Sequence, residues 1–167
     1  MYKIKLILLD IDGVVNSSSF IKSRNFDPPF TKKEKQTMSS GNVDIVDIRS
    51  INPKHIKLLN NIIKQTNAKI VISSSWKINS SINQITAIFE HHGFAGEIIG
   101  ATPNLNYKGR GKEIQKWIDD TDYKIDKFVI IDDNSDMDHL MPFLVKTKFS
   151  HGLTKSIEDK VIKILTE

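Results

Sequence analysis

The amino-acid sequence predicts an α/β protein in which about five parallel strands form one doubly wound sheet covered by helices. Short apolar runs alternate with longer amphipathic segments along the 167 residues, and this alternation is typical of βαβ units. The apolar runs contain few polar residues, as expected of strands that are buried on both faces. The length is ordinary for one domain, so we expect residues 1–167 to form a single domain.

The first apolar run, Ile4–Leu9, predicts a buried strand. The segment that follows it, residues 14–52, shows little periodicity and contains Pro28-Pro29. A structureless loop of this length is unusual inside a compact domain. We therefore expect residues 14–52 to form a flap or small cap inserted after the first strand.

Strands and helices then alternate to the end of the sequence. Asn52-Pro53 predicts a helix N-cap followed by proline at the first helical position. Gly93 predicts a C-terminal glycine cap for a later helix. Further strands are expected at 68–72, 97–100, 127–131 and 144–149, and helices from 53 onward and at 81–92, 111–120 and 156–165.

Three of the predicted strands end in polar side chains. Asp10 and Asp12 follow the first strand, the three serines 73–75 follow the second, and Asp132-Asp133 follow the fourth. The carboxyl ends of parallel strands lie on one edge of a sheet, so these clusters are expected to converge. Two adjacent carboxylates are costly to bury unless a cation offsets their repulsion. The pair Asp10/Asp12 therefore predicts a metal-assisted site.

A group of cations, Lys108-Gly109-Arg110-Gly111-Lys112, lies at the start of the helix before the fourth strand. Acids that hold a metal, hydroxyls that donate to an anion and a cationic side chain together describe a phosphoryl-transfer site. The sequence has no cysteine, which excludes thiolate nucleophiles and cysteine-based metal sites. Its five histidines show no metal-ligand or catalytic-triad spacing.

These motifs, in this order, resemble those of the haloacid dehalogenase-like (HAD) superfamily of phosphohydrolases. A Lys or Arg precedes the last motif, and the other matching segments are Leu8–Val14 around Asp-x-Asp, Ile70–Ser73 and Val129–Asp136. The resemblance covers almost the whole chain except residues 14–52. A narrower set of segments looks like the small HAD domains of RNA-repair (Swiss Army knife) proteins, which are similar to the phosphatase half of polynucleotide kinase-phosphatases. Those segments are Val71–Trp76, Arg110–Ile114 with Trp117, and Ile131–Met137.

The resemblance implies a Rossmann-like HAD fold and a role for each motif. It makes Asp10 the nucleophile that forms an aspartyl-phosphate. It makes Asp12 the acid that protonates the leaving oxygen and then the base that activates water. It implies a Mg²⁺ cofactor held by Asp10, the backbone carbonyl of Asp12 and an acid from Asp132/Asp133. Ser73 is expected to donate to a phosphoryl oxygen.

The cation that offsets the phosphoryl charge is either Arg110 or Lys112. Arg110 fits the repair-like pattern better, and Lys108 fits it least. Gly13 and Ser74 are expected to contact the substrate, with Ser74 or Ser75 also capping the segment that follows. Three residues keep a structural alternative: Asp136 and Asp138 as acids at a helix N-terminus, and Trp76 as a packing residue instead of a base-stacking one.

The substrate class stays open between nucleic-acid ends and small phosphorylated metabolites or nucleotides. Five lysines and one acid lie within residues 51–90, whereas eleven Lys/Arg and thirteen Asp/Glu follow. Such a basic region suits a phosphate-rich partner but is also common on solvated helix faces. An insert too short for a full cap leaves the site open to polymers. We therefore place RNA or DNA end phosphatase ahead of small-molecule phosphatase or phosphotransferase.

Two other classes of protein fit the sequence less well. A response-regulator receiver domain has its adjacent acidic pair after the first strand, whereas here the pair comes at Asp132. A catalytically silent HAD-like binding module is disfavoured because both Asp10 and Asp12 are retained. No apolar segment is long enough to span a bilayer, so we expect a cytoplasmic enzyme without a membrane partner. The oligomeric state is left open.

Overall fold

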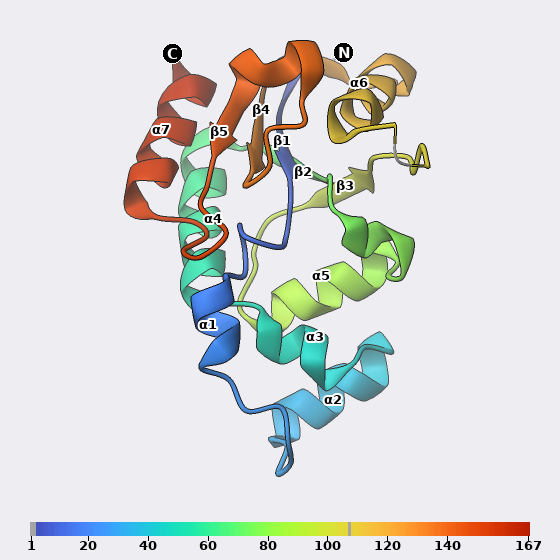
Figure 1. The fold of residues 1–167 in the computed structure, drawn as a ribbon, viewed down its shortest axis with the longest axis vertical. Coiled ribbons are helices and arrows are strands. Elements are labelled where there is room, and N and C mark those ends of the chain that lie inside the picture. Colours follow the sequence, from blue (N-terminus) through green and yellow to red (C-terminus); the bar gives the residue numbers. More distant parts are fainter. Residues whose placement is uncertain (1–2, 107) are drawn as a thin grey trace.

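The computed structural model describes residues 3–106 and 108–167. Over these residues the centre is a five-stranded parallel sheet of order β3-β2-β1-β4-β5 (Figure 1). The predicted α/β doubly wound fold class is confirmed. The strand order reverses beside β1, which is where such sheets bind ligands. The strands are β1 (Lys3–Leu9), β2 (Lys69–Ile72), β3 (Ile98–Ala101), β4 (Lys124–Asp132) and β5 (Leu144–Lys146).

The fifth strand is shorter than the sequence predicts. Its pairing with β4 ends at Lys146, whereas the apolar pattern predicts a strand through residue 149. The backbone turns after this point, and Lys148 pairs with Gly152 in an isolated antiparallel bridge. Gly152 has a φ of 66°, a left-handed conformation that favours glycine. The residues after Lys146 therefore form a tight turn instead of extending the sheet.

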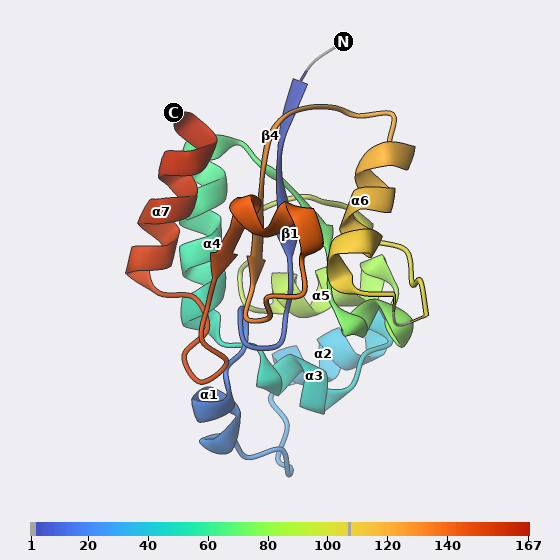
Figure 2. The same ribbon diagram turned by 45° about the horizontal axis from the view of Figure 1, so that its top comes forward.

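Helices cover both faces of the sheet. Ile7 and Leu9 of β1 pack on one face with α4 (Pro53–Thr66), α5 (Ile82–His91) and α7 (Lys155–Thr166). Leu6 and Leu8 pack on the other face with α6 (Arg110–Asp120) and the short 3₁₀ helix η2 (Asp138–Phe143). In Figure 2, α4 and α7 lie side by side on one flank, and α6 lies on the other. β1 is therefore buried on both faces, as its apolar run predicts.

The predicted helix signals are present at the expected positions. The Asn52 side chain caps α4 by accepting a hydrogen bond from the Lys54 N–H, and Pro53 is the first helical residue. Gly93 follows α5 with a φ of 86°, and its N–H donates to the Glu90 carbonyl. Among the described residues, no helix combines the length and the apolar character needed to cross a membrane.

Residues 14–52 contain three helices, α1 (Ser18–Lys22), α2 (Lys32–Gly41) and α3 (Ile45–Ser50). The three lie at one end of the molecule, on the side to which the carboxyl end of β1 points (Figure 1). α2 and α3 pack against α5 and against each other. The insert is therefore a small helical unit that rests on the sheet domain through α5.

Arg49 of α3 holds the segment between α1 and α2 in place by hydrogen bonds. Its guanidinium donates to the backbone carbonyls of Asn25, Asp27 and Pro29, and to both carboxylate oxygens of Glu34 at 2.7 and 2.9 Å. Glu34 also closes a capping box at the start of α2. Its hydrogen bonds with Arg49 lower the pKa of Glu34 to about 2.

Substitution Glu34→Gln tests this ion pair. We expect a loss of about 2 kcal/mol in the free energy of unfolding at pH 7, because Arg49 loses a charge-assisted bidentate partner. A lowered folded-state pKa gives stability that is present above the ordinary pKa of Glu and is lost as the pH falls towards about 2. The difference between wild type and variant should therefore shrink between pH 5 and pH 3 in urea unfolding. The exposed Glu90→Gln is the control, and a pH-independent difference would contradict the interpretation.

Candidate active site

Three carboxylates meet at the carboxyl edge of the central strands. β1 and β4 pair in parallel with Leu9 opposite Ile131, so the next residues, Asp10 and Asp132, lie side by side. Asp10, Asp132 and Asp133 each offer an oxygen within 4.8 Å of the others. Asp10 is 4% exposed and Asp132 is fully buried. The convergence expected from the sequence is therefore present for these three acids.

The two buried carboxyl groups disfavour each other's charge. Burial raises the pKa of Asp10, and the nearby Arg110 and the Ser74 hydroxyl oppose that rise. Burial also raises the pKa of Asp132, and the neighbouring Asp10 raises it further. A positive charge placed between them would stabilise both in the ionised form.

Arg110 supplies one such charge. Its Nη1 lies 3.0 Å from Asp10 Oδ1 and 2.9 Å from Asp132 Oδ2. The same nitrogen donates to the backbone carbonyl of Ser73. One guanidinium thus joins the carboxyl ends of β1, β4 and β2.

The start of α6 is fixed so that Arg110 reaches this position. Gly109 precedes the helix and has no side chain to cap it. Asp136, in the loop after β4, takes over the capping: its carboxylate accepts from the Arg110 N–H at 3.2 Å, and its carbonyl accepts from the Gly111 N–H at 2.9 Å. A Cβ on Gly111 would lie 2.5 Å from the Met137 backbone, so only glycine fits there. Asp136 therefore lies at the N-terminus of α6, which it caps from the loop after β4.

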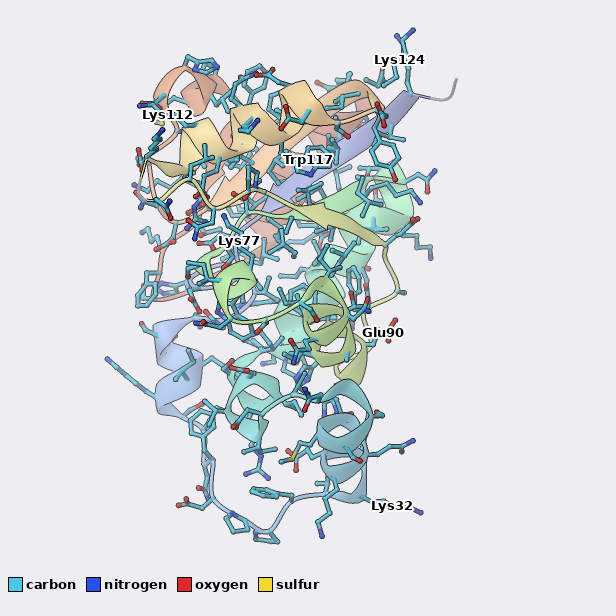
Figure 3. All side chains as sticks on the ribbon, turned by 90° about the vertical axis from the view of Figure 1, so that its right-hand side faces the viewer. Lys32, Lys77, Glu90, Lys112, Trp117 and Lys124 are labelled. Atoms are coloured by element: carbon cyan, nitrogen blue, oxygen red, sulfur yellow. The ribbon has the colours of Figure 1, made fainter. Side chains whose placement is uncertain are left out.

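Lys112, the alternative cation, lies outside the site. It follows Arg110 by two residues, which is about 200° around a helix. Its side chain is exposed and lines a different surface depression with Gln115 and Lys116. Figure 3 shows it on the outer surface of α6. Of the two cations that the resemblance offered, Arg110 is the one that contacts the carboxylates.

Asp12 is held apart from the acidic cluster by two neutral donors. The Trp76 indole N–H lies 3.1 Å from each carboxylate oxygen of Asp12. Asn16 Nδ2 donates to Asp12 Oδ1 at 2.7 Å, and the Asn16 amide oxygen accepts from the Gly13 N–H. Trp76 lies in η1 (Ser75–Ile78), directly after β2. The sequence suggested Trp76 only for base stacking or packing and gave Asn16 no role, so it did not predict either hydrogen bond to Asp12.

The three serines occupy different environments. Ser73 is fully buried, and its Oγ has no hydrogen-bond partner among the described residues. Ser74 is also fully buried and caps η1 through the Trp76 N–H. Ser75 is exposed and lines the open pocket in front of Asp10. The sequence assigned Ser75 only to capping, so its place at the pocket is new.

Gly13 shapes the site through its backbone. Its φ is 75°, and a Cβ there would lie 2.8 Å from the Asp133 carboxyl carbon. Its N–H and carbonyl already bind Asn16 and Thr147. Gly13 is not among the described residues that line the pocket. We expected contact with substrate here, but the geometry instead lets Asp133 approach the turn.

The pocket in front of these residues has a volume of about 510 Å³. Asp10, Asp12, Asp133 and Arg110 line it, together with Asn134, Ser135 and Lys146, which the sequence left unassigned. Lys146 donates to the Ser135 hydroxyl at 2.6 Å. It is the last residue of β5 and therefore lies on the same edge of the sheet, which is the signal that could have identified it.

The acidic cluster fits a magnesium ion. Its donors are carboxylate oxygens from the ends of two adjacent strands, which are the hard ligands that Mg²⁺ prefers. Burial raises the pKa of Asp10 and Asp132, so a divalent cation would relieve an existing electrostatic cost. Asp10, Asp132 and Asp133 are the residues that would hold the ion.

Comparison with known families agrees with this geometry. The family described as the HAD domain in Swiss Army Knife RNA repair proteins matches residues 6–157. No curated protein matches the chain. The matched region includes Asp10, Asp12, Ser73, Arg110 and the Asp132-Asp133 pair. The protein therefore belongs to the family of HAD domains found in Swiss Army Knife RNA repair proteins.

Proposed function

We propose that the protein is a Mg²⁺-dependent phosphohydrolase that removes phosphate from nucleic-acid ends through an aspartyl-phosphate on Asp10. The observation that carries the proposal is the cluster of three carboxylates with Arg110, of which Asp10, Asp133 and Arg110 line an open pocket. Membership of a HAD family of RNA repair proteins supports hydrolase chemistry.

The first step forms a bond between an Asp10 carboxylate oxygen and phosphorus, while the bond from phosphorus to the leaving oxygen breaks. Asp12 gives its proton to that oxygen, which leaves as a hydroxyl. In the second step Asp12 takes a proton from water as the water oxygen forms a bond to phosphorus and the bond from the Asp10 oxygen to phosphorus breaks, which releases the Asp10 carboxylate. Inorganic phosphate then leaves, and Asp10 and Asp12 return to their starting states.

Other residues of the pocket act on the phosphoryl oxygens. Mg²⁺, when bound, supplies positive charge that offsets the repulsion between Asp10 and an anionic substrate. Arg110, the first residue of α6, neutralises charge on the transferred group. The exposed Ser75 hydroxyl lines the pocket and is a donor available to that group. The Ser73 hydroxyl, to which the resemblance gives this role, has no partner among the described residues but is fully buried behind the pocket lining. Lys146 adds a second cation at the rim of the pocket.

The open form of the site supports a polymeric substrate. Among the described residues that line the pocket, none comes from α1, α2 or α3. A small insert that leaves the pocket uncovered admits the end of a long chain, whereas a large cap would enclose a small molecule. We therefore favour nucleic-acid ends over small metabolites or free nucleotides.

Substitution Asp10→Asn tests the nucleophile. The amide cannot form the acyl phosphate, so Mg²⁺-dependent hydrolysis of an aryl phosphate should fall on the order of 10³-fold or more. Thermal unfolding followed by circular dichroism checks that the fold persists. The matched control is Asp119→Asn, an exposed acid on α6, which should retain wild-type turnover. Near-normal turnover of Asp10→Asn would rule out this nucleophile.

Substitution Trp76→Phe tests the positioning of Asp12. Phenylalanine keeps the apolar ring but removes the N–H that binds Asp12. We expect single-turnover release of an alkyl alcohol from its phosphate to slow about tenfold, with less than about twofold loss for 2,4-dinitrophenyl phosphate, whose leaving group needs no proton. Trp117→Phe, on the core face of α6, is the control. Equal losses with both leaving groups would indicate a purely structural role.

A comparison of substrates tests the proposed class. With Mg²⁺, kcat/KM for a 3′-phosphorylated oligonucleotide should exceed that for nucleotides and sugar phosphates. It should also fall steeply with added salt, because binding a polyanion releases counterions. A salt-insensitive preference for a small metabolite would contradict the nucleic-acid substrate and indicate a small-molecule phosphatase. The proposed phosphoryl-transfer mechanism would then still stand.

A further inference from the structure

Two neighbouring depressions share residues with the catalytic pocket and differ in charge. One shares Ser75, Arg110 and Asn134 with it. Two cations, Lys77 and Arg110, and two acids, Glu113 and Asp136, line this depression, so its formal charges balance. The other shares Lys146 with the catalytic pocket and has a volume of about 270 Å³. Among the described residues that line this second depression there is no acid. If the end of an anionic polymer binds in the pocket, the rest of the polymer is therefore expected to extend towards Lys146.

The second depression is built on the turn that follows β5. Lys148 and His151 line it together with Lys146. Phe149, at the tip of the turn, is 53% exposed. Exposed aromatic rings beside cationic side chains are the combination with which proteins bind single-stranded nucleic acids.

This turn is held in place against the catalytic loop. The Thr147 hydroxyl donates to the Gly13 carbonyl at 2.6 Å, and the Leu153 N–H donates to the Val14 carbonyl at 2.9 Å. On the other side, the Ser18 N–H of α1 donates to the Phe149 carbonyl at 3.1 Å. Figures 1 and 2 both show the turn beside α1. The backbone that carries Phe149 is thus fixed relative to Asp10 and Asp12.

The basic region that the sequence singled out does not provide this surface. None of its five lysines is among the described residues that line the catalytic pocket or the second depression. Lys77 is buried in an ion pair with Glu113, and Lys69 pairs with Glu97. Their charges are already neutralised by protein carboxylates. In contrast, the described contacts of Lys148 include no carboxylate within ion-pair distance. The positive charge of Lys148 is therefore available to an anionic ligand.

We propose that the turn 147–152 is a subsite for the nucleotide next to the phosphorylated end of a single-stranded nucleic acid. Lys146 and Lys148 bind the phosphodiester that links this nucleotide to the terminal one. Phe149 stacks on its base. The subsite rests on the proposed function, because it assumes that the terminal phosphate lies against Asp10.

Binding to the Asp10→Asn protein with Mg²⁺ tests the subsite without turnover. Fluorescence anisotropy with labelled, 3′-phosphorylated RNA and DNA oligonucleotides gives Kd at several salt concentrations. Phe149→Ala should raise Kd about tenfold through lost stacking. Lys148→Gln should lower the slope of log Kd against log salt by about 0.7, the value for one phosphate contact on a single strand. Lys124→Gln, at the amino end of β4 and so at the opposite end of this strand from Asp132, is the charge-matched control.

Kinetics on otherwise wild-type protein give a second readout. The ratio of kcat/KM for a 3′-phosphorylated dinucleotide to that for a nucleoside 3′-phosphate should fall about tenfold in Phe149→Ala. Lys124→Gln should keep the wild-type ratio. Unchanged Kd, salt slope and ratio in both turn variants would overturn the subsite. Absence of hydrolysis by the wild-type protein would instead overturn the proposed function, and the binding measurements would still decide whether the turn holds a nucleic acid.

Discussion

The contact of Arg110 with Asp10 and Asp132 is the interaction on which the rest of the site depends. The register between β1 and β4 forces these two carboxylates together at a buried edge. Removing them from water without a counter-charge would be strongly unfavourable. One guanidinium balances only part of two buried carboxylates and the adjacent Asp133, so the site keeps an excess of negative charge. That excess is what makes a divalent cation a suitable further ligand.

One buried ion pair connects the residues that contact Asp10 and Asp12. Lys77 follows Trp76, which binds Asp12, and Glu113 lies one helical turn after Arg110, which binds Asp10. Lys77 and Glu113 are paired with side chains only 8% and 12% exposed. Breaking a buried pair leaves an uncompensated charge, so its two elements are expected to move together. The proposed nucleophile and the proposed acid/base are thus held by elements that are themselves joined.

The sequence predicts the features of the fold and the site that depend on local residue patterns and on which residues end the strands. The order of strands and helices follows from apolar periodicity and caps such as Asn52-Pro53 and Gly93, and the meeting of Asp10 with Asp132 follows from parallel pairing. It does not predict which cation points inward, because Arg110 and Lys112 differ only by their angle around α6. Nor does it predict Trp76 and Asn16 as partners of Asp12. Those contacts depend on how η1 and the turn after β1 pack, and neither carries a sequence period.

The strand order accounts for the asymmetry of charge around the pocket. On the β2 side, Lys77 lines the neighbouring depression, and α6 places Glu113 directly against it. On the β4 side, β5 is the edge strand and its end carries Lys146, beyond which the chain turns back to the Asp10–Gly13 loop instead of meeting another strand. No further strand of the described sheet follows to bring a neutralising acid. Positive charge therefore persists along this edge, and the sheet's topology itself gives the proposed anionic substrate a direction in which its chain can extend from the pocket.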